Sequence, residues 1–257
     1  MFFVASVVFY KGVGIMQGVG KTDIGKNRTN NEDCIYVSNS NVGALANLYV
    51  VADGMGGHAY GEVASSKAVE FFCKYFTENS NFVYKEDYMQ EALAYANKEI
   101  FAKALSEPSM LGMGTTFTAV TLDNQNLYYA HVGDSRLYVL KTTGELLQIT
   151  KDHSLVHELT RDGIISLAQA ETHPDKNVLT RAVGTEEHVK IDKGFYPLND
   201  AEKILLCSDG LTNMLSDADI LSLISSDMSL ADIVAQLLHN ANDNGGIDNI
   251  SVILIGR

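Results

Sequence analysis

Short apolar runs bounded by turn-forming residues dominate the chain, and they predict β-strands. The clearest runs are Asn47–Ala52, Thr115–Leu122, Leu127–Val132, Arg136–Lys141, Lys203–Ser208 and Ser251–Ile255. They are rich in valine, isoleucine, leucine, threonine and tyrosine, which favour pleated, buried positions. Several follow one another after only a short turn, such as the glycine, aspartate and serine at 133–135. This succession predicts hairpins of antiparallel strands.

Longer segments instead repeat apolar residues at helical spacing, which predicts amphipathic helices. These segments are Gly61–Phe76, Asp87–Leu105 and Leu230–Ala241. Ser229 with Asp232, and Ser216 with Asp219, are typical of capped helix starts. Because the helices are grouped and do not alternate regularly with strands, the pattern favours antiparallel sheets covered by helices. It leaves open whether there are one or two sheets.

Charge and composition narrow the class of protein. The 257 residues carry 19 basic and 32 acidic side chains, so the formal net charge is −13. This balance disfavours binding of nucleic acid through a broad basic surface. No run approaches the ~20 apolar residues of a membrane-spanning helix, so we expect no stable membrane insertion. The three cysteines lack metal-site or disulfide spacing, which indicates thiols in a reducing, cytoplasmic setting.

The first residues differ from the rest of the chain. Met1–Tyr10 is apolar but short, and it lacks the basic leader and cleavage site of a signal peptide. A second methionine, Met16, directly precedes the first motif described below. We therefore expect residues 1–15 to be an extension outside the fold and residues 16–257 to form a single domain. Protein that begins at Met16 is predicted to be as stable and active as the full chain.

Candidate chemistry lies in aspartates at the ends of predicted strands. Asp53 follows the strand VVA, Asp209 follows LLCS, and Asp248 precedes SVILI. If these strands are neighbours, the three carboxylates meet at one end of a sheet. Clustered carboxylates repel one another unless cations compensate them, and oxygen-only clusters suit Mg²⁺ or Mn²⁺. These residues alone leave an equal alternative, in which the aspartates lie in separate turns that never meet.

An arginine and a histidine near these aspartates are further candidates. The guanidinium fork of Arg28 is suited to a phosphate group, although a surface ion pair with Glu32 or Asp33 is the commoner role at this spacing. His58 follows two glycines at the start of a predicted helix, where it is either an acid catalyst or a solvated side chain. His131 and His153 lie in strand-edge and turn segments, which favour structural roles.

Eight short motifs follow one another along the chain. They are TDIGKNRTNNED (22–33), VADGMGGHAYGEVAS (51–65), GTT (114–116), HVGDSRLY (131–138), ITKDHSLV (149–156), THPDKNVLTRAVG (172–184), LLCSDGL (205–211) and DNISVIL (248–254). In wording and order they resemble the PPM family, the type 2C metal-dependent serine/threonine phosphatases, and most closely its compact bacterial members. The resemblance covers essentially everything from about residue 17 to the C-terminus. It implies an α+β fold, a four-layer α-β-β-α sandwich of two antiparallel sheets flanked by helix pairs.

The resemblance also implies a centre of two Mn²⁺ or Mg²⁺ ions. By motif, Asp53 bridges both ions and the Gly54 carbonyl binds the first, while Asp209 and Asp248 hold the second. Asp33 supports the first ion, mostly through water.

Three further residues match the family's motifs. Asp134 corresponds to the aspartate that, with Asp209, frames a third and weaker metal site. Arg28 matches the phosphate-binding arginine. His58 matches a proposed general acid only loosely, because Met55 stands in the family's histidine position and His58 comes three residues later.

The function that the resemblance implies is hydrolysis of phosphoserine and phosphothreonine on proteins, by a water that bridges two metals. The expected partners are a Ser/Thr kinase of the same cell and the substrates of that kinase, and we expect a monomer. Residues 160–175 correspond to a flap beside the active site that influences substrate choice. Two alternatives remain: an inactive, phosphatase-like regulatory or binding module, and a metal-dependent phosphodiesterase or nuclease.

Overall fold

The computed structural model describes residues 16–56 and 60–257, which form two antiparallel sheets flanked by helices. One sheet has five strands in the order β1-β11-β10-β7-β8, and the other has six strands in the order β2-β3-β5-β6-β9, with β4 paired to β3. The strands are β1 Gln17–Asp23, β2 Asp33–Ser38, β3 Leu48–Met55, β4 Gly114–Thr115, β5 Phe117–Leu122, β6 Asn126–Val132, β7 Arg136–Lys141, β8 Leu146–Gln148, β9 Asp192–Pro197, β10 Ala201–Cys207 and β11 Ile250–Gly256.

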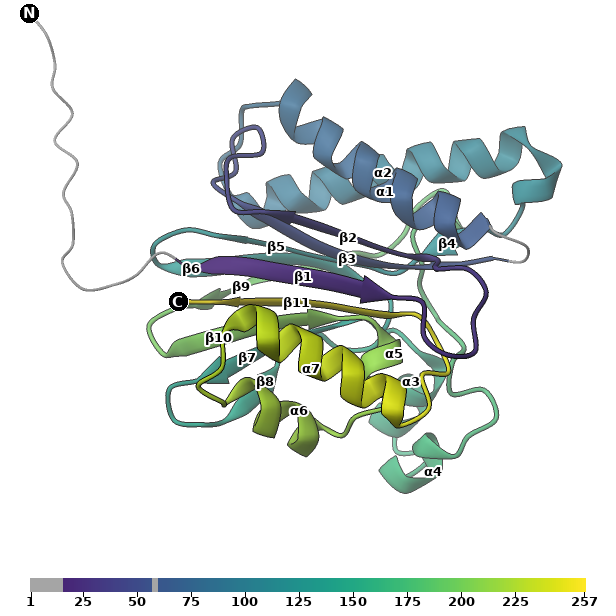
Figure 1. The fold of residues 1–257 in the computed structure, drawn as a ribbon. Helices are drawn as coiled ribbons and strands as arrows, with labels where there is room; N and C mark the ends of the chain where they lie inside the picture. Colours follow the sequence, from purple (N-terminus) through teal and green to yellow (C-terminus); the bar gives the residue numbers. More distant parts are fainter. Residues whose placement is uncertain (1–15, 57–59) are drawn as a thin grey trace, which may run out of the picture.

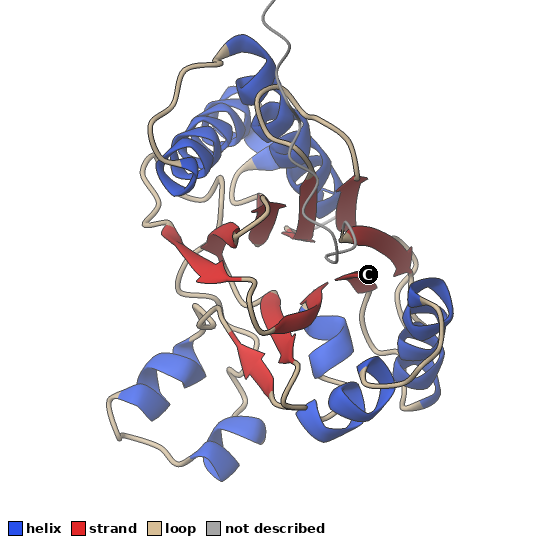
Figure 2. Ribbon diagram, turned by 90° about the vertical axis from the view of Figure 1, so that its left-hand side faces the viewer, coloured by secondary structure: helices blue, strands red, loops and turns tan. Residues whose placement is uncertain are grey.

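The longer helices lie on the outer faces of the two sheets, and shorter ones lie at one end of the sandwich (Figures 1 and 2). They are α1 Tyr60–Glu78, α2 Lys85–Ser106, α3 Leu155–Arg161, α4 Leu167–Glu171, α5 Asp209–Thr212, α6 Asp217–Ile224 and α7 Leu230–Asp243, with a 3₁₀ turn at Pro108–Met110. Helices α1 and α2 cover the six-stranded sheet, and α6 and α7 cover the five-stranded sheet (Figure 1). The expected four-layer α-β-β-α sandwich is therefore confirmed, and the question of one or two sheets is answered.

Alternation along β3 shows why the layers hold together. Tyr49 and Val51 are fully buried in the core between the two sheets. Val50 and Ala52 point the other way, into the core beneath α1 and α2. Since successive side chains of a strand point to opposite faces, a strand covered on both faces must be apolar at every position. This is why the sequence shows continuous apolar runs instead of alternating ones.

Side-chain caps begin the helices near the C-terminus as the sequence predicts. The hydroxyl of Ser216 accepts a hydrogen bond from the amide of Asp219, and the Asp219 carboxylate accepts one from the amide of Ser216. The Ser229 hydroxyl likewise accepts a hydrogen bond from the amide of Asp232 at 3.2 Å. These caps satisfy backbone groups that lack partners at a helix start.

Three further sequence expectations concern the start of the chain, membrane insertion and the flap. The predicted extension, residues 1–15, lies outside the described residues, so the division at Met16 stays a prediction. Within the described part of the chain, no helix is long and apolar enough to cross a membrane.

The predicted flap, residues 160–175, contains α4, which projects away from the sandwich (Figure 1).

Candidate active site

A cavity of about 250 Å³ opens where strand ends of the two sheets meet. Four aspartates and an arginine line it: Asp53, Asp134, Asp209, Asp248 and Arg28. The remaining lining residues are Glu32, Gly54, Met55, Gly56, Thr116, Asn177, Leu179 and Asn249. The alternative in which the aspartates lie in unrelated turns is therefore wrong.

The aspartates reach the cavity from both sheets. Asp53 lies in β3 of the six-stranded sheet, whereas Asp209 follows β10 and Asp248 precedes β11 in the five-stranded sheet. The expectation that the three come from neighbouring strands of one sheet holds only for the β10–β11 pair. Face-to-face packing of the sheets supplies the third carboxylate, so the cavity exists only in the assembled sandwich.

Asp53 is fixed through its backbone. Its amide donates a 2.9 Å hydrogen bond to the hydroxyl of Thr116. Its carbonyl accepts hydrogen bonds from the amide of Thr116 at 2.8 Å and from the hydroxyl of Thr115 at 2.9 Å. These contacts leave the carboxylate free to face the cavity.

Asp33 lies behind the cavity and does not line it. It is paired with Asp53 across the β2–β3 ladder, and one of its carboxylate oxygens accepts a 2.8 Å hydrogen bond from the Ser208 hydroxyl. Among residues 16–56 and 60–257, neither its other oxygen, Oδ1, nor Oδ1 of Asp209 has a hydrogen-bond partner, and both atoms are buried. A buried carboxylate oxygen without a donor is costly, and a cation would compensate it.

The raised pKa values of the clustered carboxyls also indicate that the site needs cations. Burial raises the pKa of the Asp33 carboxyl to about 7, and the charges of Asp209 and Asp248 contribute. Burial and neighbouring carboxylates also hold the pKa of Asp53 and Asp134 well above the usual range, and they raise the pKa of Asp209. The carboxylates therefore cannot all be ionised near neutral pH without added positive charge.

Arg28 supplies one such charge at the edge of the cavity. Its guanidinium donates a 2.7 Å hydrogen bond to Oδ2 of Asp248, and this bond is the main reason why the pKa of Arg28 is raised. The side chain remains about half exposed. The partner is thus Asp248, and not Glu32 or Asp33, the partners that the sequence spacing favoured.

The backbone at Gly54 can only be formed by glycine. A Cβ atom there would overlap the carbonyl oxygens of Gly61 and Glu32. This close approach holds the strand end beside the loop that carries Arg28, and the Gly54 amide donates a 3.1 Å hydrogen bond to the Glu32 carbonyl. His58, the remaining candidate, lies outside the described residues.

The donor set fits hard cations that keep water ligands. Among residues 16–56 and 60–257, no group of three or more acidic, histidine or cysteine side chains is arranged to enclose a metal by itself. Mg²⁺ usually takes only one or two protein carboxylates and completes its shell with water. The buried, unpaired oxygens of Asp33 and Asp209, together with the oxygen-only lining, match that requirement.

Asn249 is a residue of the site that the sequence analysis did not single out. Its amide oxygen accepts a 2.9 Å hydrogen bond from the amide of Glu32. Its amide nitrogen donates hydrogen bonds of 2.9 Å to the carbonyls of Ile24 and Asn30. Asn249 therefore clamps the loop that carries Arg28 against β11. The only signal in the sequence was its place directly after Asp248.

Asn177 and Leu179 were also missed as site residues. They line the cavity on the side of the predicted flap, and Leu179 forms an isolated β-bridge with Ser154, at the start of α3. The bridge brings the two ends of the α3–α4 segment together at the cavity. Nothing in the local sequence indicates this placement.

With this geometry established, comparisons with known proteins identify the class. The family described as protein phosphatase 2C matches residues 19–254. The chain is 40% identical over 245 residues to a serine/threonine phosphatase, stp, of Listeria innocua, an alignment that covers 92% of this chain and 94% of that protein. The chain therefore belongs to the protein phosphatase 2C family.

Solved structures agree with this assignment. The structure of serine/threonine phosphatase Stp1 from Staphylococcus aureus has a TM-score of 0.87 and 32% identity, and the match covers 99% of both chains. The catalytic domain of serine threonine protein phosphatase PstP, solved in complex with two manganese ions, has a TM-score of 0.81 and 33% identity over 94% of this chain and 97% of that one. The expected family, fold and enzyme class, a protein serine/threonine phosphatase, are confirmed, and the inactive alternative is not supported.

Proposed function

We propose that this chain hydrolyses phosphoserine and phosphothreonine esters of proteins in the cavity between the two sheets, with two divalent cations as cofactors. The observation that carries the proposal is the convergence of Asp53, Asp209 and Asp248 from both sheets on one cavity that also holds Arg28. The manganese ions in the PstP structure support the choice of cofactor. Bound divalent ions would supply Lewis acidity and a water of lowered pKa for attack on phosphorus.

Each candidate ligand has a place in this proposal. Asp53 lies centrally and would contact both ions, with the Gly54 carbonyl on the first ion, and Asp209 and Asp248 would hold the second. Asp33 is set back behind the cavity, which supports a role through water. Asp134 faces the same cavity, and it would frame a third, weaker site with Asp209.

Arg28 is placed to bind the phosphoryl oxygens. Its guanidinium is half exposed at the cavity edge, and a planar fork of donors matches a phosphate group. In the structure this fork is engaged by Asp248 at 2.7 Å. A cation on Asp248 would weaken that ion pair and make the guanidinium available to substrate. The net charge of −13 otherwise repels phosphate, so the cations and Arg28 together must reverse the local field.

The partners follow from the reaction class. We infer that the substrates are phosphoproteins made by a Ser/Thr kinase of the same cell, and that the α3–α4 segment beside the cavity influences which of them bind. Cys34, Cys73 and Cys207 are free thiols, which supports a cytoplasmic location. The monomeric state stays a prediction that size-exclusion chromatography with light scattering tests directly.

The decisive experiment removes one carboxylate at a time. Asp209→Asn and Asp248→Asn should each abolish Mn²⁺-dependent hydrolysis of a phosphothreonine peptide. The control is Asp227→Asn, because Asp227 is exposed and lies outside the cavity. Near-normal turnover by either cavity variant refutes the site. A wild-type protein inactive on p-nitrophenyl phosphate would favour a regulatory module, and activity on a phosphodiester would favour the phosphodiesterase alternative.

A further inference from the structure

A second cavity, of about 380 Å³, lies at the open edge of the sandwich. It is bounded by β6 and β9, the last two strands of the six-stranded sheet, and by the segment that follows β8, the edge strand of the other sheet. Its lining is Tyr129, His131, Ile149, Thr150, Lys151, Ile191, Asp192 and Lys193, and it shares no residue with the phosphatase cavity. Its volume is in the range of sites for small molecules.

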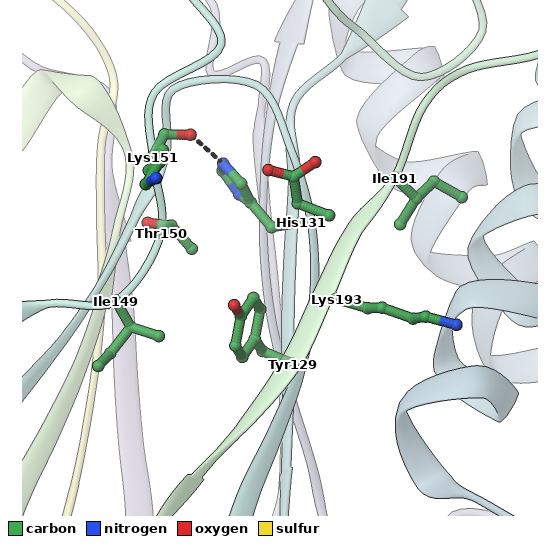
Figure 3. A pocket seen from close by; sticks show the side chains of 8 residues that line it. Tyr129, His131, Ile149, Thr150, Lys151, Ile191 and Lys193 are labelled. Carbon is green, nitrogen blue, oxygen red and sulfur yellow. Dashed lines mark hydrogen bonds between the residues drawn. The ribbon is translucent and has the colours of Figure 1, made fainter. Parts of the chain in front are cut away.

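Most charged groups around this cavity already have partners. The two carboxylate oxygens of Asp192 contact the Arg181 guanidinium at 2.9 Å and Nε2 of His153 at 3.1 Å. The Lys193 ammonium points away from the cavity (Figure 3) and pairs with Asp87 of α2. Neither Asp192 nor Lys193 therefore leaves an uncompensated charge for a ligand.

Two hydrogen-bond donors remain at the cavity. Within the described part of the chain, neither the Lys151 ammonium nor the Tyr129 hydroxyl has a hydrogen-bond partner, and both residues line the cavity. Burial raises the pKa of Tyr129, so its hydroxyl keeps its proton and stays a donor. Ile149 and Ile191 supply apolar walls, and Ile149 faces Tyr129 across the cavity (Figure 3).

We propose that this cavity is an effector site for a small organic carboxylate, whose anionic group binds Lys151 and Tyr129 and whose apolar body packs between Ile149 and Ile191. A single uncompensated ammonium group matches a monoanion better than a phosphate dianion. Ordinary small-molecule sites likewise combine apolar walls with a few directed polar groups. Binding of the carboxylate does not depend on the proposed phosphatase mechanism, because the linings of the two cavities share no described residue.

The wall of this cavity is connected to the phosphatase site by hydrogen bonds. Nε2 of His131 lies 3.1 Å from the carbonyl oxygen of Lys151, and Nδ1 lies 2.9 Å from the Thr118 hydroxyl. A carbonyl only accepts, so His131 carries its proton on Nε2 and accepts the Thr118 proton on Nδ1. Burial lowers the pKa of His131 to about 4, so the ring is neutral at physiological pH. Nε2 therefore remains the donor and Nδ1 the acceptor.

The connection continues to the backbone of Asp53. The single Thr118 proton is donated to His131, so the Ser135 carbonyl, 3.2 Å from the Thr118 oxygen, is a contact and not a second hydrogen bond. The connection therefore runs along the backbone from Thr118 to Thr116, two residues earlier, whose hydroxyl is 2.8 Å from that of Ser135. The Thr116 hydroxyl in turn accepts the 2.9 Å hydrogen bond from the Asp53 amide. A carboxylate ligand that moves the Lys151 segment would therefore shift the backbone of Asp53. Binding of this ligand and binding at the phosphatase site should be reciprocally coupled.

The first test measures binding by the full-length, Mg²⁺-loaded protein. Benzoate, titrated into ¹⁵N-labelled protein, should give saturable shifts centred on residues 129, 151 and 191–193. Sulfate, which lacks the apolar body, and benzyl alcohol, which lacks the charge, should bind at least tenfold more weakly. Lys151→Met and Tyr129→Phe should each weaken benzoate binding at least fivefold. The matched control is Lys190→Met, because Lys190 is exposed and lies outside the cavity although it directly precedes the lining residue Ile191.

Two outcomes of this titration overturn the site. One is the absence of saturable shifts at these residues. The other is benzoate binding that Lys151→Met and Tyr129→Phe leave unchanged, or that shifts mainly residues of the phosphatase cavity.

The second test measures coupling by calorimetry, with Mg²⁺ titrated in the presence and absence of saturating benzoate. We expect the Mg²⁺ dissociation constant to change by about fivefold, the lower end of typical allosteric coupling. Thr118→Ser, which keeps the hydroxyl, should retain this change, and Thr118→Val should lose it. An unchanged Mg²⁺ affinity in the wild-type protein, or coupling that survives in Thr118→Val, overturns the hydrogen-bonded connection.

Discussion

The carboxylate cluster makes the stability of the metal-free protein depend on pH in an unusual direction. The Asp33 carboxyl has its pKa raised by burial from the usual 3.8 to about 7. The folded state therefore keeps a proton that the unfolded state has already released between these two values. Stability falls as pH rises wherever the folded state binds more protons than the unfolded state. The metal-free protein should therefore lose stability from about pH 4 to about pH 7. The pKa of Asp53, Asp134 and Asp209 is also raised, so these groups act with the same sign.

The size of the effect follows from Asp33 alone. Each pKa unit corresponds to about 1.4 kcal/mol, so Asp33 lowers the free energy of unfolding by roughly 4 kcal/mol across this range. Urea unfolding in the presence of a chelator, repeated between about pH 4 and about pH 8, measures it. Asp33→Asn removes the titrating group but keeps an acceptor for Ser208, so the variant should show a smaller slope and exceed wild-type stability at pH 7.5 by roughly 2–4 kcal/mol.

One control variant and two possible results test this pH dependence. Asp227→Asn changes an exposed aspartate outside the cavity, and it should keep the wild-type slope. A wild-type stability that is constant or rises between pH 5 and pH 7 would show that the buried carboxyls are ionised without cost. A slope that Asp33→Asn leaves intact would show that the titrating group lies elsewhere.

Three other predictions concern single residues of the site and the core. Arg28→Ala should raise KM for a phosphothreonine peptide more than it lowers kcat, and steady-state kinetics with an unchanged KM would argue against phosphate binding by Arg28. Asn249→Ala removes hydrogen bonds to Ile24, Asn30 and Glu32, so urea unfolding should show a loss of about 2–3 kcal/mol, with weaker Mg²⁺ binding in calorimetry. Leu237→Ala, in the fully buried core under α7, should cost about 2–5 kcal/mol while the Mg²⁺ dissociation constant stays within twofold.

The sequence pattern predicted the central strands and long helices well because each buries a continuous surface. The run Asn47–Ala52 became β3, Leu48–Met55, and Arg136–Lys141 became β7 with the same bounds. Strands β1, β2, β8 and β9 were missed. β1, Gln17–Asp23, contains glycines at positions 18 and 20, where a Cβ atom would overlap side chains of the opposing sheet. Small residues required by sheet packing leave no apolar signature in the sequence.

The four aspartates and the arginine that line the cavity had been singled out from the sequence, but their contacts had not. The aspartates could be identified because each adjoins a predicted strand, and the order of the motifs resolved the remaining ambiguity. The partner of Arg28 could not be predicted, since Asp248 lies 220 positions away and the pairing of β1 with β11 brings the two segments together. The same holds for the bonds from Asn249 to Asn30 and Ile24. Tertiary pairing, which local sequence does not encode, decides these contacts.

The division of the carboxylates between two sheets links function to stability. Asp53 lies in the six-stranded sheet, whereas Asp209 and Asp248 adjoin strands β10 and β11 of the five-stranded sheet. Their mutual repulsion therefore acts between the two sheets. The apolar core there, which includes Tyr49, Val51 and Ile253, must hold the sheets together against that repulsion when no cation is bound. A cation bound by aspartates of both sheets would reverse the sign of this interaction and would stabilise only the folded state, by an amount that grows with the logarithm of its concentration above the dissociation constant. Affinity for the cation and resistance to unfolding therefore depend on the same arrangement of carboxylates. A substitution that neutralises the cluster should increase the stability of the metal-free protein, and metal should no longer stabilise that variant.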